Sequence, residues 1–135
     1  MMFGLTIREF DERGVLSIEL RDILQLLGRD AEQSIWRIEG VEALGENATR
    51  IHDVSHQIGT LVGSELARVA SGLDQIVDGT FSAFKDGNDQ PWVVIAAVDS
   101  SAYDVMTAEL HVIWALKRAF ESAEFIPGME PSSVD

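Results

Sequence analysis

The segment His52-Asp53-Val54-Ser55-His56 holds two of the three histidines of the chain, four residues apart, with an acid directly after the first. On a helix the two imidazoles would stand on one face, with their Cβ atoms about 6 Å apart, near enough to share a zinc ion. Asp53 could then act as a base toward a metal-bound water. One function to consider is therefore a metal-dependent hydrolase that uses His52, Asp53 and His56.

Two features of this segment weigh against a metal site. Its spacing is close to the zinc-protease pattern H-E-x-x-H, but aspartate replaces the glutamate and is one methylene shorter. A zinc site also needs a third protein ligand, for which the sequence offers only His111 or an unspecified carboxylate. If the segment were a strand, its histidines would lie about 13 Å apart and could not meet at one ion. We expect two surface histidines here, and no metal or other cofactor.

Other catalytic patterns are weak or missing. A pair of carboxylates could serve as general acid and base if burial raised the pKa of one of them. The carboxylates around the most apolar part of the chain are Asp74, Asp78, Asp99 and Asp104. Among 23 acidic residues some are close by chance, and turn roles explain Asp78 and Asp99. Neither a G-x-S-x-G elbow around Ser100 and Ser101 nor a glycine-rich phosphate loop is present. No catalytic residue is assigned, and the sequence favours a protein that is not an enzyme.

A tryptophan lies off the apolar stripe of the longest expected helix, Ala108–Ala123. The stripe itself follows helical spacing and consists of Val112, Ile113, Leu116, Ala119, Phe120 and Ala123. Leu110 and Trp114 project away from it, close to Arg118. An indole in this position needs cover, either from the chain through Phe125 and Ile126 or from another protein, where tryptophan anchors are enriched. We therefore predict an interface at Leu110, Trp114 and Arg118, with a homodimer as one form of it.

The charge balance narrows the class of partner. Ten Lys and Arg stand against 23 Asp and Glu, a net charge of -13, which repels nucleic acids and anionic membranes and attracts basic proteins. The absence of cysteine excludes disulfides and thiol chemistry. The N-terminus does not resemble a signal peptide, and no apolar run approaches the ~18 residues of a membrane span. We expect a cytoplasmic protein that binds neither nucleic acid nor membrane.

Three functions follow from these observations. The leading hypothesis is a non-enzymatic, soluble interaction protein that presents an acidic surface to a basic partner, as an immunity-type or neutralising protein would, and that forms a homodimer. The alternatives are the metal-dependent hydrolase described above and a small-ligand-binding domain with a pocket between sheet and helices.

The residues named so far must be positioned by a sheet built around two apolar, β-favouring runs. These runs, Gln75–Phe84 and Trp92–Val98, are joined by the turn residues of Lys85–Pro91. The pattern predicts a β-hairpin at the centre of the sheet. The second run contains no alternating polar residues, so we expect both faces of its strand to be covered.

The rest of the chain supplies further strands and helices. Alternation predicts strands at Leu5–Phe10, Ser34–Leu44 and Ala102–Met106. Helices are expected at Ile18–Leu27 with a Gly28 cap, within Thr49–Leu61, from Ser64 to Gly72, and at Ala108–Ala123. Short connections near the C-terminus require antiparallel pairing. The predicted fold is a single α+β domain over residues 1–126, with a mainly antiparallel sheet of four to five strands, a central hairpin at 75–98 and three to four helices. Residues 127–135 are expected to be a disordered tail.

Overall fold

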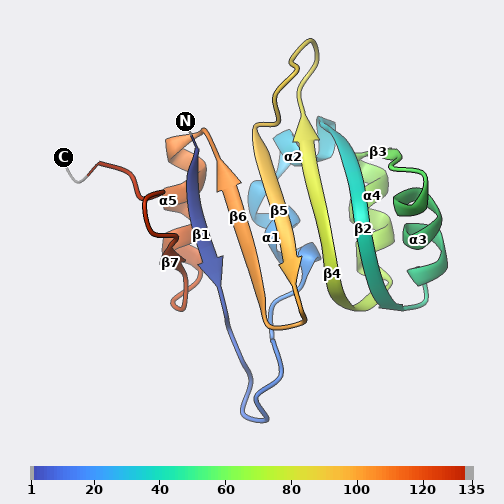
Figure 1. Ribbon diagram of the computed structural model, residues 1–135, viewed down its shortest axis with the longest axis horizontal. Coiled ribbons are helices and arrows are strands. Elements are labelled where there is room, and N and C mark those ends of the chain that lie inside the picture. The colour runs from blue at the N-terminus through green and yellow to red at the C-terminus, as the bar shows by residue number, and fades with distance from the viewer. Residues whose placement is uncertain (1, 133–135) are drawn as a thin grey trace.

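The computed structural model describes residues 2–132, in which seven strands form one sheet in the order β3-β2-β4-β5-β6-β1-β7 (Figure 1). Every strand pair is antiparallel. The strands are β1 (Phe3–Ile7), β2 (Ile35–Gly45), β3 (Thr60–Val62), β4 (Leu73–Phe84), β5 (Val93–Val98), β6 (Ala102–Thr107) and β7 (Glu124–Phe125). The helices in the same range are α1 (Leu20–Leu27), α2 (Arg29–Gln33), α3 (Ala48–His56), α4 (Gly63–Ser71) and α5 (Leu110–Ala119).

The α+β class and the antiparallel sheet agree with the prediction, but the predicted numbers of strands and helices were too low. The additional elements, α2, β3 and β7, contain five, three and two residues. Elements this short do not complete a periodic pattern, because a helix needs about two turns and a strand about four residues to show one. The polar segment Arg29–Gln33, for which the sequence predicts no element, is α2.

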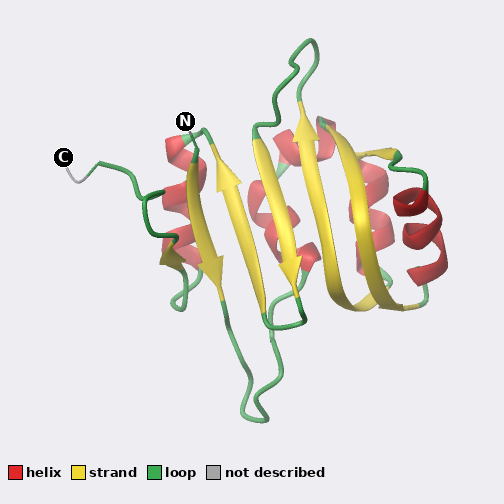
Figure 2. Ribbon diagram, viewed as in Figure 1, coloured by secondary structure: helices red, strands yellow, loops and turns green. Residues whose placement is uncertain are grey.

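The predicted hairpin is present and central. β4 and β5 pair with each other and occupy the third and fourth places of the seven described strands. The Trp92 N–H donates to the Ala83 carbonyl at 2.9 Å, so the pairing extends to the base of the loop. The connection between them, Lys85–Pro91, projects beyond the end of the sheet (Figure 2).

Element ends differ from the prediction for local reasons. The first helix begins at Leu20 instead of Ile18, because the Glu19 N–H donates to the Asp22 carboxylate at 2.8 Å and makes Glu19 the N-cap. The predicted helical segment Thr49–Leu61 divides into α3 and β3 around Ile58, whose φ is 47°. The last helix is shorter than predicted and ends at Ala119.

The helices cover one face of the sheet. In Figure 1, α1, α2, α4 and α5 lie behind the strands, and α3 lies beside the β2–β3 edge. Side chains that point toward the helices form the core and are fully buried, among them Leu5, Trp36, Ile38, Phe81, Ile95 and Val105. Residues that alternate with these point to the opposite face, where Val94 and Ala96 are only partly buried. The expectation that both faces of β5 are covered is therefore wrong within the described chain.

Both sheet edges are protected. On one side β3 pairs with the first three residues of β2. Beyond the end of β3, side chains of α3 accept hydrogen bonds from the backbone of β2. The Val41 N–H donates to Ser55 Oγ at 2.7 Å, and the Ala43 N–H donates to His52 Nε2 at 3.0 Å. On the other side the two-residue β7 pairs with β1, and the chain continues so that the Gly4 N–H donates to the Met129 carbonyl at 3.0 Å. These edges offer little to an additional strand.

The predicted disordered tail begins within the described residues. Its part up to residue 132 includes Met129, whose carbonyl is bonded to Gly4, and Pro131, which is buried. Residues 133–135 lie outside the described residues.

The atoms around Gly63 show how closely the helical layer is packed. A methyl group at Gly63 would overlap the backbone carbonyl of Ala31, which cannot move without shifting α2. At Gly4, in contrast, a methyl group would lie 3.0 Å from Ile126 Cδ1 and from Met129 Sδ, which are flexible side-chain ends. We expect Gly63→Ala to lower the free energy of unfolding by about 3 kcal/mol or more, and Gly4→Ala by about 1 kcal/mol, in urea denaturation. Equal losses would contradict this packing.

Candidate functional site

The two histidines of the possible metal site lie on α3, one turn apart, but one of them has a structural role. His52 Nε2 accepts the hydrogen bond from the Ala43 N–H at 3.0 Å. The Nε2 lone pair is therefore used in a bond to β2 and is not free to coordinate a metal ion. Across residues 2–132 no group of three or more His, Asp or Glu side chains is placed to hold a metal. The third ligand that a hydrolase built on His52, Asp53 and His56 requires is therefore not found in that range.

Of the four acidic residues singled out from the sequence, Asp78 and Asp104 have side-chain hydrogen-bond partners, and Asp74 is an exposed residue of β4. Asp78 Oδ1 accepts the Asp99 N–H at 2.9 Å, which fastens the β5–β6 turn to β4. Within this turn Asp99 and Ser100 have φ values of 50° and 58°. Asp104 Oδ1 accepts the Thr6 hydroxyl at 2.6 Å between neighbouring strands. These contacts join elements and do not pair two carboxyl groups for acid–base catalysis.

The predicted interface residues lie on α5. Leu110 is 49% exposed and Trp114 is 38% exposed, and Arg118 is exposed as well. The Trp114 ring meets the Phe125 ring edge to face, with centroids 5.5 Å apart, so the chain after α5 covers one side of the indole. A homodimer through Leu110, Trp114 and Arg118 stays a prediction.

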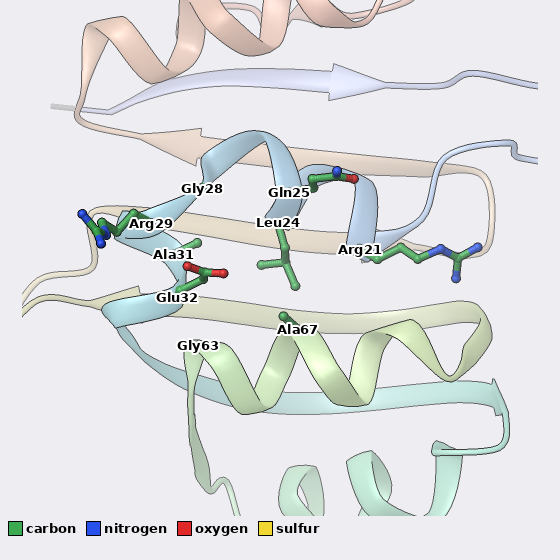
Figure 3. A pocket seen from close by; sticks show the side chains of 9 residues that line it. All are labelled: Arg21, Leu24, Gln25, Gly28, Arg29, Ala31, Glu32, Gly63 and Ala67. Carbon is green, nitrogen blue, oxygen red and sulfur yellow. The ribbon is translucent and has the colours of Figure 1, made fainter.

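A cleft of about 260 Å³ lies between α1, α2 and α4. Leu24 and Ala67 face each other across it, and the Glu32 carboxylate points inward, whereas the guanidinium groups of Arg21 and Arg29 point away from its centre (Figure 3). Arg21 Nη1 donates to the Leu73 carbonyl at 3.0 Å. The cleft is smaller than the roughly 300 Å³ at which ligand pockets commonly begin, and no set of polar groups converges in it. It gives the small-ligand alternative little support.

The face of the sheet opposite the helices, here called the open face, has an apolar half. In this half Ile35 is paired with both Val62 and Phe84, and Val94 is paired with Met106. Ile35 is 41% exposed and Val62 is 49% exposed, while the other three are partly buried. This half lies toward the end of the sheet from which the Lys85–Pro91 loop projects.

The other half of the open face is acidic. Its carboxylates come from four strands and are Glu39, Glu42, Asp78, Asp104 and Glu124. Glu42 stands directly opposite Asp78, although like charges in such cross-strand pairs destabilise a sheet. Arg37 supplies a cation to the face, and its guanidinium lies 4.9 Å from the Phe84 ring centroid. Among the outward residues of the seven described strands, five acids stand against this one base, so this part of the open face is negative.

Sequence reasoning missed a titratable pair in the interior. Glu19, the N-cap of α1, is partly buried, and this burial raises its pKa to about 7, with the Asp22 charge adding to the rise and Arg21 opposing it. Burial, followed by the neighbouring Glu19 carboxylate, also raises the pKa of Tyr103, a fully buried residue of β6. Nothing in the spacing of residues 19 and 103 could have indicated this proximity.

The Glu19 shift predicts a pH dependence of stability. The folded-state pKa of about 7 lies above the ordinary value of 4.5, so the stabilisation is complete below pH 4.5 and is lost as the pH rises through 7. Because Glu19 retains access to solvent, we expect the free energy of unfolding to fall by only about 1–2 kcal/mol between pH 5 and pH 8.5. Glu19→Gln should flatten this profile in urea titrations, whereas exposed Glu12→Gln should keep it. An unchanged slope in Glu19→Gln would contradict the assignment.

Comparison with protein-family models, with curated proteins and with solved structures gave no match. Within the described range none of the helices has the length and apolar character that a membrane crossing requires.

Proposed function

We propose that the protein is a non-enzymatic binding protein whose open face receives a basic protein partner. The observation that carries this proposal is the uncovered face of β5 and its neighbours. A strand whose residues are apolar on both faces is normally covered on both, yet Val94 points to a side on which no described helix lies. A partner that occupied the open face would supply the missing cover.

Charge decides which kind of partner fits. Among the outward residues of the described strands, carboxylates outnumber cations five to one, and the net charge of the whole chain is -13. A partner with lysine or arginine opposite Glu39, Glu42 and Asp104 would be attracted at long range and fixed in orientation on contact. A second copy of this chain would bring the same carboxylates face to face. The proposed homodimer through α5 uses a helix on the other side of the sheet and leaves the open face free.

The dimensions suit a protein partner. Five strands spaced ~4.8 Å apart and about six residues long give a flat area of roughly 500 Å². Side-chain relief and the neighbouring loops increase this area toward the ~800 Å² that each partner contributes to a stable complex. Because the edges are protected, docking on the face is more accessible than strand addition. Neutralisation of a basic toxin or nuclease is one role that such a surface could serve.

A capture experiment with matched charge variants tests the proposal. Glu39→Lys with Glu42→Lys reverses two charges on the open face, and the new lysine at 42 can pair with Asp78 across the strands. Glu12→Lys with Glu121→Lys makes the same change in net charge at exposed positions elsewhere. We expect the wild type and the second variant to retain the same basic protein from cells of the source organism, and the open-face variant to bind it at least tenfold more weakly.

Affinity for the captured protein should also fall as salt rises, because the attraction between the two charged surfaces is screened. The proposal fails if no protein is retained, if the retained protein is acidic, or if both double variants bind it equally.

A further inference from the structure

We propose that a pocket at the apolar corner of the open face receives an arginine side chain of the partner; this inference rests on the proposed function. The pocket has a volume of about 430 Å³ and lies where β2 begins and β4 ends. Ile35 and Phe84 from the open face line it, together with Asp30 and Gln33 of the α2 segment and Lys85 and Asp86 of the hairpin loop. A partner seated on the open face would therefore reach the pocket without a further change in position.

The apolar wall of the pocket suits the aliphatic part of an arginine. Ile35 and Phe84 are direct cross-strand partners, so their side chains lie side by side, and Ile35 is 41% exposed. The long stem of arginine commonly packs along such surface while its charged end stays in a polar environment. The protein makes a related contact itself, since the Arg37 guanidinium stacks over the Phe84 ring at 4.9 Å.

The charged wall of the pocket favours a cation despite the presence of Lys85. Lys85 Nζ lies 3.1 Å from a Glu109 oxygen and 3.7 Å from an Asp30 oxygen, and also 4.9 Å from the Trp92 ring centroid. Its charge is thus already balanced by neighbouring groups. Asp86 has no hydrogen bond or ion pair within residues 2–132 and is exposed to solvent.

Arginine fits the remaining polar groups better than a neutral side chain. The Ser34 hydroxyl is already engaged, because it accepts the Trp92 indole N–H at 2.8 Å and donates to the Asp30 carbonyl at 2.7 Å. Of the two carboxylates that line the pocket, Asp30 is paired with Lys85, so Asp86 is the charged acceptor that remains for a guanidinium, which can bind a carboxylate through two parallel hydrogen bonds. Arginine is also among the residues that concentrate binding energy in pockets at interfaces.

A small-molecule titration tests the pocket without the partner. N-acetyl-L-arginine methylamide is added to ¹⁵N-labelled protein, and N-acetyl-L-citrulline methylamide serves as its neutral isostere. We expect saturable shifts of the Ile35, Phe84 and Asp86 amides with the arginine compound at millimolar concentration, and at least fivefold weaker binding of the citrulline compound. Asp86→Asn should weaken arginine binding at least fivefold, whereas Asp89→Asn, in the same loop but outside the pocket, should leave it unchanged.

The outcomes separate this inference from the proposed function. Equal binding of the two compounds, equal effects of the two loop variants, or shifts confined to other residues would overturn the arginine pocket. If the captured partner still loses affinity on open-face charge reversal but binds Asp86→Asn as well as wild type, the proposed function stands and the pocket is not its anchor. Arginine binding without any captured partner would support the pocket and remove the proposed function.

Discussion

An antiparallel sheet can leave one face in water when that face carries polar side chains. In this protein only part of the exposed sheet face is polar, and the rest of the architecture has to be understood from that constraint. The helical layer packs on the side that buries Trp36, Phe81 and Ile95 completely. The other side is divided, with carboxylates over one half and Ile35, Val62, Phe84, Val94 and Met106 over the other. The acidic half comes closer to this condition than the apolar half, although Leu44 and Val98 are exposed there. The proposed binding function follows from this contrast.

The protected edges of the sheet explain why we expect a partner to dock on the open face and not to add a strand at an edge. A three-residue strand and α3 close one edge, and a two-residue strand followed by the Met129 contact closes the other. His52 belongs to this arrangement, because its imidazole accepts a backbone N–H that the short β3 leaves unpaired. His52, a candidate metal ligand in the sequence, thus has a structural role at the edge of the sheet.

The sequence predicted the longer elements, because each has a pattern that is complete within one continuous stretch of the chain. The hairpin followed from two β-favouring runs around turn residues, and the end of the first helix followed from Gly28, which adopts a φ of 69° there. The short elements α2, β3 and β7 left no pattern, since each is held in place by neighbours distant in the sequence. The continuous apolar character of β5 predicted cover on both faces, but within residues 2–132 the helices cover only one of them (Figure 1), and this depends on the packing of distant elements that the run itself does not encode. The acidic half of the open face could not be predicted from the sequence either, because its carboxylates come from four strands and are brought together only by the register of the sheet.

The most direct test of the open face as a binding surface is methyl NMR of the protein in complex with its captured basic partner. The outward methyl groups of Ile35, Val62, Val94 and Met106 can be compared with the inward ones of Ile38, Ile95 and Val105 on the same sheet. We expect the partner to shift or broaden the outward methyl signals and to leave the inward ones nearly unchanged. Perturbation confined to Leu110 and the other methyl groups of α5, with the outward set unaffected, would contradict it.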